Sequence, residues 1–244
     1  MSRCGKNYFV TFIDDYSRYT KVYLIKRKDE AFDVFLTYKA EVENQLNKKI
    51  KRIRSDRGGE YVLFNDFCVK EGIIHEVTPP YSPESNGVAE RKNRTLNEMM
   101  NVMLISSSAP DNLWGEALLT ACFLQNRIPH KKTGKTPYEL WKGYQPNLKY
   151  LRVWGCLAKV MLPDPKKRKI GSKTSDCMFL GYVEHSDAYR FLVLKSDVIE
   201  HNTIVETKNV EVFEHIFSLK VSDTVEQPIE NNSEDMYEVS RSKR

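Results

Sequence analysis

The feature that most constrains the fold is a turn-forming segment that runs directly into a long stretch with no helix breaker. It spans residues 81–103 and reads YSPESNGVAERKNRTLNEMMNVM. Pro83, Asn86 and Gly87 favour a turn, whereas the residues after them favour a helix. The sequence therefore predicts a loop that leads into a helix, with Glu90 in the first helical turn and its carboxylate held at a fixed place.

The predicted helix has one polar and one apolar face. A period of 3.6 residues brings four polar residues to one face, namely Glu90, Asn93, Arg94 and Asn97. The opposite face offers four apolar side chains for burial, which are Leu96, Met99, Met100 and Met103. One acid and several groups that bind phosphate thus project together. A simpler interpretation is that Glu90 only favours the positive end of the helix dipole.

A second acidic position favours a functional role for Glu90 over a purely structural one. In RSDRGGEY, residues 54–61, a basic strand ends at Asp56, and the paired glycines Gly58 and Gly59 follow it. The carboxyl ends of strands are where open α/β sheets place their ligands. Asp56 and Glu90 are therefore candidates for one shared site.

Six motifs occur along the chain in a recognisable order. They are FIDDYSRY (12–19), RSDRGGEY (54–61), TPPYSPESNGVAERKNRTL (78–96), KTPYELWKG (135–143), LRVWGC (151–156) and FLGY (179–182). The first three resemble the integrase core of the copia-type (Ty1/copia) retrotransposon polyproteins, and the others continue that resemblance into the SH3-like module of the family. The resemblance implies a ribonuclease-H-like integrase core, the fold shared by retroviral integrases, followed by a small SH3-like β-barrel.

The resemblance also implies roles for individual residues. Asp56 matches the second acid and Glu90 the third acid of the family's D,D,E triad, and each would bind one Mg²⁺ (or Mn²⁺) ion. Magnesium prefers hard oxygen ligands, and two such ions can activate the attacking oxygen and stabilise the leaving oxygen. Asn93 and Arg94 would face the viral-end DNA. The implied function is DNA integration by Mg²⁺-dependent polynucleotidyl transfer.

The chain departs from the family at the first acid of the triad. In the family this acid lies in a segment resembling H-x-D-x-C-G-P, ahead of the strand that matches residues 8–13, and this chain begins after it. Asp14 and Asp15 are possible substitutes for this acid, but they align with the family's hairpin turn, where we expect instead an Asx-type hydrogen bond to the turn or an ion pair with Arg18. With two of three acids, we expect weakened metal affinity and catalysis reduced by orders of magnitude, because catalytic groups that act as a unit fail together.

Two other functions remain open. The chain could be a non-catalytic DNA-binding module retained by its host, or an assembly partner of an intact integrase, because such cores dimerise through sheet and helix faces. The basic run PKKRK (165–169) leaves three roles open as well. Lys166, Lys167 and Arg168 could bind DNA phosphates, form a nuclear import signal or lie in a solvated turn.

The charge distribution favours an anionic partner. The net charge is +5, and residues 220–244 hold six acids and four bases, so residues 1–219 carry +7. A basic body of this kind suits DNA. The chain has no apolar run long enough for a membrane span and no signal-peptide pattern at its start, so we expect an intracellular location, in the cytoplasm or the nucleus. The five cysteines are scattered, without the spacing of a zinc site.

Apolar periodicity predicts two architectures in succession. The first has strands at 8–13, 19–25, 49–55 and 73–77, and helices at 29–46, after a possible cap at Asn65, from Glu90 onward and at 112–127. This order predicts a mixed sheet with helices on both faces and its first strand missing, which would leave an unpaired edge. A capped helix beginning at Thr136 follows, and then strands at 154–161, 176–182, 189–195 and 203–212 predict the barrel. We expect the integrase core at 1–146, the SH3-like domain at 150–217 and a disordered tail at 218–244.

Overall fold

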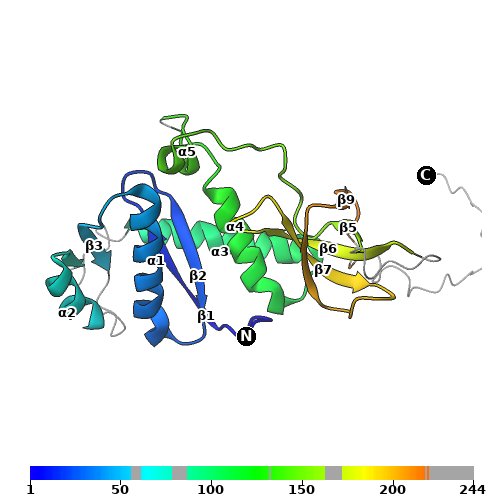
Figure 1. The fold of residues 1–244 in the computed structure, drawn as a ribbon, viewed down its shortest axis with the longest axis horizontal. Helices are drawn as coiled ribbons and strands as arrows, with labels where there is room; N and C mark the ends of the chain where they lie inside the picture. The colour runs from blue at the N-terminus through cyan, green and yellow to red at the C-terminus, as the bar shows by residue number, and fades with distance from the viewer. Residues whose placement is uncertain (56–61, 79–86, 132, 163–171, 218, 220–244) are drawn as a thin grey trace, which may run out of the picture.

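The structure is a computed structural model that describes residues 1–55, 62–78, 87–131, 133–162, 172–217 and 219 (Figure 1). The first half contains β1 (Tyr8–Ile13), β2 (Thr20–Ile25), η1 (Lys28–Glu30), α1 (Ala31–Leu46), β3 (Arg52–Ser55), α2 (Val62–Glu71), β4 (Ile74–Val77), α3 (Gly87–Ser107), η4 (Asp111–Leu113), α4 (Trp114–Gln125) and α5 (Pro137–Lys142). The second half contains β5 (Leu157–Met161), β6 (Thr174–Tyr182), β7 (Tyr189–Lys195), β8 (Ile204–Thr207) and β9 (Val210–Phe213). The predicted change from α/β to all-β structure is confirmed.

The β1–β2 hairpin packs against different helices on its two faces, because side chains alternate along a strand. On one face, Phe12 and Tyr23 join the apolar cluster of α1. On the other face, Phe9, Val22 and Leu24 pack against residues of α3 and α4. The predicted coverage of both faces by helices is therefore confirmed for this hairpin.

Strands β3 and β4 form a parallel pair of their own, in which Ser55 lies opposite Val77. In the part of the chain that the structure describes, β1 pairs only with β2 and β3 only with β4. The single mixed sheet that the sequence predicts is thus divided into two sheets of two strands, since no described strand lies between them. Helix α1 links the two sheets, because its Phe35 ring lies 5.9 Å from that of Phe12 on β1 and Ile53 of β3 packs against the same cluster.

Two predicted boundaries are wrong for local reasons. The strand predicted at 49–55 begins only at Arg52, because the backbone N–H of Ile50 donates to the Glu43 carboxylate at 2.9 Å instead of to a strand. Helix α2 begins at Val62, so Asn65 lies inside the helix rather than at its cap. Its side-chain oxygen lies 2.5 Å from Nδ1 of His75 on β4.

The second half is a curled five-stranded antiparallel sheet in the order β8-β7-β6-β5-β9. Strands β8 and β9 lie at opposite edges, yet only Lys208 and Asn209 separate them in the chain. A connection of this length spans at most about 11 Å, so the sheet must curl until its edges approach each other. This curling confirms the predicted barrel. It also shows that the prediction of one strand over 203–212 is wrong, since the chain crosses between edges at these two residues.

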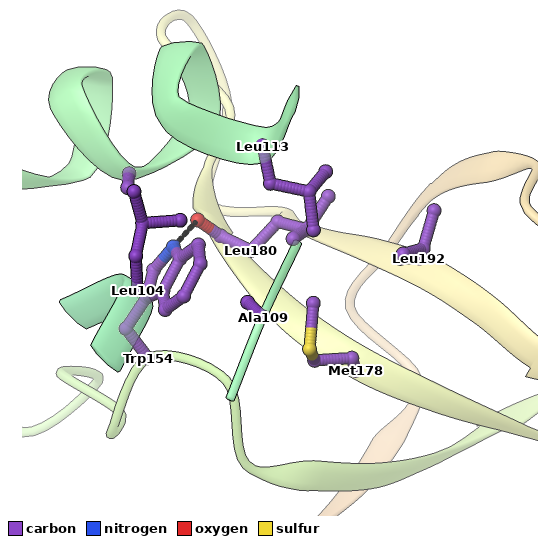
Figure 2. Packing of buried hydrophobic residues seen from close by; sticks show 8 residues of the cluster. Leu104, Ala109, Leu113, Trp154, Met178, Leu180 and Leu192 are labelled. Carbon is purple, nitrogen blue, oxygen red and sulfur yellow. Dashed lines mark hydrogen bonds between the residues drawn. The ribbon is translucent and has the colours of Figure 1, made fainter. Parts of the chain in front are cut away.

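Strand β6 is covered on both sides. Phe179 lies in the barrel interior, whereas Leu180 packs outward against Leu104 and Leu113 of the first half (Figure 2). The indole N–H of Trp154 donates to the Leu180 carbonyl at 2.7 Å, as the dashed line in Figure 2 marks. One apolar cluster therefore contains residues from both predicted domains.

Helix α4 lies between the two halves and contacts both β2 and β6 (Figure 1). Arg190 on β7 binds the Glu116 carboxylate on α4 through two hydrogen bonds of 2.9 and 3.1 Å. Among the described residues, no helix is both long enough and apolar enough to cross a lipid bilayer. The predicted tail at 218–244 lies outside the described residues, apart from Leu219.

Candidate functional site

Glu90 lies in the first turn of α3, which begins at Gly87, and its side chain is exposed. Arg94 and Asn97 on the same face are exposed too. On the opposite face, Leu96 is fully buried. The predicted two-faced helix is confirmed, and its backbone presents the Glu90 carboxylate to solvent from a fixed position.

Helix α3 is joined to the hairpin near its amino end. The Thr11 hydroxyl on β1 donates to the side-chain oxygen of Asn93 at 3.0 Å. At the neighbouring position on the helix, burial lowers the pKa of Lys92, and the nearby positive charge of Arg18 in the hairpin turn lowers it further. Farther along the helix, Leu96 packs in the same cluster as Phe9. The amino end of α3 therefore points toward the turn of the β1–β2 hairpin.

The carboxyl end of β3 reaches the same hairpin turn. The Arg54 guanidinium lies 3.5 Å from the Asp15 carboxylate in the turn and 3.1 Å from the Glu76 carboxylate on β4. Ser55 is the last residue of β3. Asp56, the predicted second acid, follows Ser55 directly in the sequence but lies outside the described residues. The end of β3 therefore contacts the same hairpin turn toward which the amino end of α3 points.

The two acids of the hairpin turn are both engaged. Asp14 accepts hydrogen bonds of 2.7 Å from the backbone N–H and from the hydroxyl of Ser17. Asp15 pairs with Arg18 at 2.8 Å. The Asx-type bond and the ion pair that the sequence offers as alternatives are both present, on different residues. These contacts support the expectation that the two acids stabilise the turn rather than replace a metal ligand.

Sequence reasoning missed a hydrogen-bonded group at the end of β3. The Ser55 hydroxyl lies 2.9 Å from Nε2 of His75, whose Nδ1 lies 2.5 Å from the Asn65 side-chain oxygen. The Ser55 carbonyl accepts two further bonds from Thr78, one from its backbone N–H at 2.9 Å and one from its hydroxyl at 3.1 Å. Burial lowers the pKa of His75. The available signal was the parallel alternation of β3 and β4, which puts Ser55 and His75 on one face of the pair.

A second group of possible metal ligands lies away from this place. Within the described ranges, Glu41, Glu184 and His185 offer ligand atoms that lie within 4.8 Å of one another. The Lys21 ammonium forms ion pairs with Glu41 and, at 2.7 Å, with Glu184. The ammonium group of Lys21 therefore already pairs with both carboxylates of this group.

The structure describes two of the five predicted DNA-binding residues. Arg94 is exposed on α3, and Asn93 is half-buried with its side-chain oxygen bound to Thr11. Lys166, Lys167 and Arg168 lie outside the described residues. The geometry therefore brings Glu90, Asn93 and Arg94 together on one face of α3, at its amino end.

Comparison with protein families and known proteins gives concordant results. The model of the integrase core domain matches residues 1–83, and the model of the retroviral polymerase SH3-like domain matches residues 156–226. The retrovirus-related Pol polyprotein from transposon TNT 1-94 of Nicotiana tabacum is 42% identical over 205 residues, which are 82% of this chain and 15% of that protein. The corresponding polyprotein from transposon RE2 of Arabidopsis thaliana is 36% identical over 183 residues, which are 75% of this chain and 13% of that protein. The chain thus spans about a seventh of the length of these relatives.

Among solved structures, the chain is similar to a chain of the simian T-cell lymphotropic virus intasome in complex with the PP2A regulatory subunit B56 gamma. That similarity has a TM-score of 0.47 and 19% sequence identity, and it covers 84% of this chain and 71% of the other.

Proposed function

The chain belongs to the integrase region of copia-type transposon Pol polyproteins, and we propose that it binds DNA and a divalent metal ion where β3, α3 and the hairpin turn meet. Its ancestral reaction is polynucleotidyl transfer in DNA integration. Asp56 and Glu90 are the proposed metal ligands. We expect an intracellular location, where such a reaction finds its DNA.

The observation that carries this proposal is a pair of contacts that join β3 and α3 to the same β1–β2 hairpin. Arg54, two residues before Asp56, contacts Asp15, and the helix that carries Glu90 is bound to β1 through Asn93, three residues later. The end of β3 and the amino end of α3 are therefore both joined to this hairpin, which supports the pairing of Asp56 with Glu90. The donor chemistry also fits, because carboxylate oxygens are the hard ligands that Mg²⁺ and Mn²⁺ accept.

When bound at this site, the metal ion would polarise a phosphodiester and help to activate the attacking oxygen. The chain's own part is to supply the two carboxylates, that of Glu90 from the first turn of α3. The Thr11–Asn93 hydrogen bond fixes α3 against β1, and Arg94 offers a guanidinium to the phosphate backbone from the same helix face. Lys166, Lys167 and Arg168 are proposed as further phosphate contacts.

We expect weak catalysis from this 244-residue chain. The proposal assigns two carboxylates to the metal, Asp56 and Glu90, and two charged ligands hold a divalent ion more weakly than three. Asp14 and Asp15 do not compensate, because each is already bound within the hairpin turn.

The metal site is tested by measuring Mn²⁺ binding through the electron paramagnetic resonance signal of free Mn²⁺. We expect Asp56→Asn and Glu90→Gln each to abolish the specific binding. Glu98→Gln is the matched control, because Glu98 is an exposed acid two turns farther along α3. Equal binding in all four proteins would overturn the proposed site.

Catalysis is tested with a strand-transfer assay on donor and target DNA in Mg²⁺ or Mn²⁺. We expect joining at or near background. A joining rate that Glu90→Gln abolishes and Glu98→Gln preserves would confirm the site but show that the expected impairment is wrong.

A further inference from the structure

A cleft of about 760 Å³ lies between the two halves of the protein. Its walls come from α1, β2, α4, α5 and the turn between β6 and β7. Glu90, Asn93 and Arg94, the described residues of the site proposed above, do not line it. Sites for small ligands measure roughly 300 to 1,000 Å³ and often lie between domains, so this cleft has the size and the location of such a site.

Arg127, which lies just after α4 and lines this cleft, is a cation without an acid partner. Its Nη1 donates to the Phe123 carbonyl at 2.9 Å, and its Nη2 donates to the Tyr150 hydroxyl at 3.1 Å. A guanidinium has five N–H donors, so three of them, including a buried Nε–H, have no acceptor in the protein as described. Cation–π contacts with the rings of Phe123 and Tyr138 partly offset the burial of the charge, but they supply no acceptor oxygen. The remaining N–H groups are therefore available to an anion in the cleft.

The charges along the cleft are unevenly compensated. Each of its four acids already pairs with a cation of the protein, namely Glu41 and Glu184 with Lys21, Glu116 with Arg190, and Asp187 with Lys208. Arg127 and Lys142, by contrast, form no ion pair among the described residues, and Lys142 donates to the Gln45 side chain at 3.0 Å. Two cations of the cleft are thus left without an acid, which favours an anionic ligand.

Aromatic rings line the cleft beside these cations. The rings of Tyr19 and Trp141 stack with their centroids 5.0 Å apart, and Tyr138 contacts Tyr144 edge to face at 5.6 Å. Tyr144 lines the cleft yet is 60% exposed, so much of its ring is open to a ligand. Every nucleobase has a flat π-face that can stack on such a ring.

We propose that this cleft binds a nucleotide, either free or as part of a single strand of nucleic acid. Arg127 binds the phosphate through its remaining N–H groups, Lys142 adds positive charge, and Tyr144 stacks on the base. An acidic peptide would pair with the two cations but would leave the exposed ring unused, so a nucleotide accounts for more of the cleft. This site is separate from the proposed metal site and needs no divalent ion.

The test uses two probes, thymidine 5′-monophosphate and the single strand octathymidylate, and measures binding by isothermal titration calorimetry in EDTA. Tyr144→Ala removes the stacking ring, and Arg127→Gln removes the guanidinium. Tyr8→Ala is the matched control, because Tyr8 is 45% exposed at the start of β1 and does not line the cleft. Circular dichroism checks that each variant is folded.

We expect at least one probe to bind the original protein, and Tyr144→Ala to weaken that binding by about 5- to 150-fold, as the loss of a stacking ring does. Arg127→Gln should weaken it by about tenfold or more, because charge-assisted hydrogen bonds to the phosphate are lost. Tyr8→Ala should bind as the original protein does. Equal affinities for the two probes would identify a free nucleotide as the ligand, whereas much tighter binding of octathymidylate would identify a strand.

The proposal is wrong if neither probe binds, or if Tyr144→Ala binds as tightly as Tyr8→Ala. It is also wrong if inorganic phosphate or hexaglutamate binds as tightly as the nucleotide probes, since the cleft would then recognise charge alone. If Arg127→Gln fails to fold, Tyr144→Ala still decides the question, because its ring is largely exposed. Because no metal is present in the assay, a failure of the proposed metal site leaves these outcomes unchanged.

Discussion

The Thr120 hydroxyl on α4 donates a 2.7 Å hydrogen bond to the Leu180 carbonyl on β6 and lies 2.2 Å from the point that a Cβ on Gly181 would occupy. The φ angle of Gly181 is 153°, in a region that other residues rarely adopt. Helix and strand thus approach so closely that only a residue without a side chain fits between them.

We therefore predict that Gly181→Ala lowers the free energy of unfolding by about 2 to 4 kcal/mol, because it combines backbone strain with overpacking against Thr120. The measurement is urea unfolding followed by Trp fluorescence. Gly5→Ala is the control, because Gly5 also has a positive φ, of 72°, but nothing lies within 4 Å of the place that a Cβ on it would occupy. An equal loss in both variants would show that strain alone accounts for the effect.

The ion pair between Arg190 and Glu116 provides a second test of the junction. The Glu116 side chain is 9% exposed, and Arg190 has an exposed second partner, Glu206. We predict that Glu116→Gln lowers the free energy of unfolding by about 2 kcal/mol, because it leaves a half-buried guanidinium without its main partner. Glu206→Gln should cost less than about 1 kcal/mol, since that acid is exposed. A larger cost for Glu206→Gln would contradict this ranking.

The shared apolar cluster predicts how the chain tolerates truncation. A fragment of residues 1–146 would expose Leu104, Leu113 and Ala117, which Leu180 and Met178 now cover. We expect this fragment to aggregate or to unfold without a cooperative transition. A chain of residues 1–219, which keeps Leu219 against this cluster, should unfold as the full chain does. Light scattering and thermal unfolding measure both, and a monomeric, cooperatively folded 1–146 fragment would show that the two predicted domains are independent.

The lowered pKa of Glu43 predicts that the folded protein loses stability in acid. Burial raises its pKa, but hydrogen bonds from Lys49, the Ile50 backbone and Lys39 outweigh burial and hold the pKa at about 2. Because the folded pKa lies below the ordinary value of 4.5, the stabilisation is complete above about pH 4.5 and is lost as the pH falls toward 2. Glu43→Gln should therefore be less stable than the original protein by about 1 to 3 kcal/mol at pH 7, and by less at pH 3. Urea unfolding at both pH values measures this, and a constant difference would contradict it.

The proposed DNA contact of Arg94 predicts that the effect of a charge change depends on its position. We expect Arg94→Glu to weaken duplex binding and to lower the slope of log affinity against log salt, because it removes a phosphate contact. Lys28→Glu makes the same charge change at the opposite end of the hairpin, where η1 follows β2, and should have a smaller effect. Fluorescence anisotropy at graded salt measures both. Equal effects would indicate that only net charge matters.

Local signals in the sequence predicted the parts of the fold that depend on near neighbours. The bond from Ser17 to Asp14 joins residues three apart, and the Thr136 cap of α5 accepts from Glu139 at 3.0 Å. The two faces of α3 follow from one helical period. Each of these features depends on a single short segment, and so it can be recognised in the sequence.

Features that depend on distant segments were not predictable in this way. The bond between Ser55 and His75 requires the parallel register of β3 and β4, and the separation of β8 from β9 requires the curl of the whole sheet. The close contact of Thr120 with Leu180 joins residues sixty positions apart. Helix α4 did carry a signal, because its residues are apolar nearly all round, which indicates burial on several sides.

Helix α4 packs against both halves of the protein, and this packing has a mechanical consequence. The barrel cannot swing away from the helix without uncovering apolar surface on both, so the two halves keep a constant separation and angle. A long polymer that contacts both halves would therefore meet two surfaces at a fixed spacing, rather than two domains that move independently.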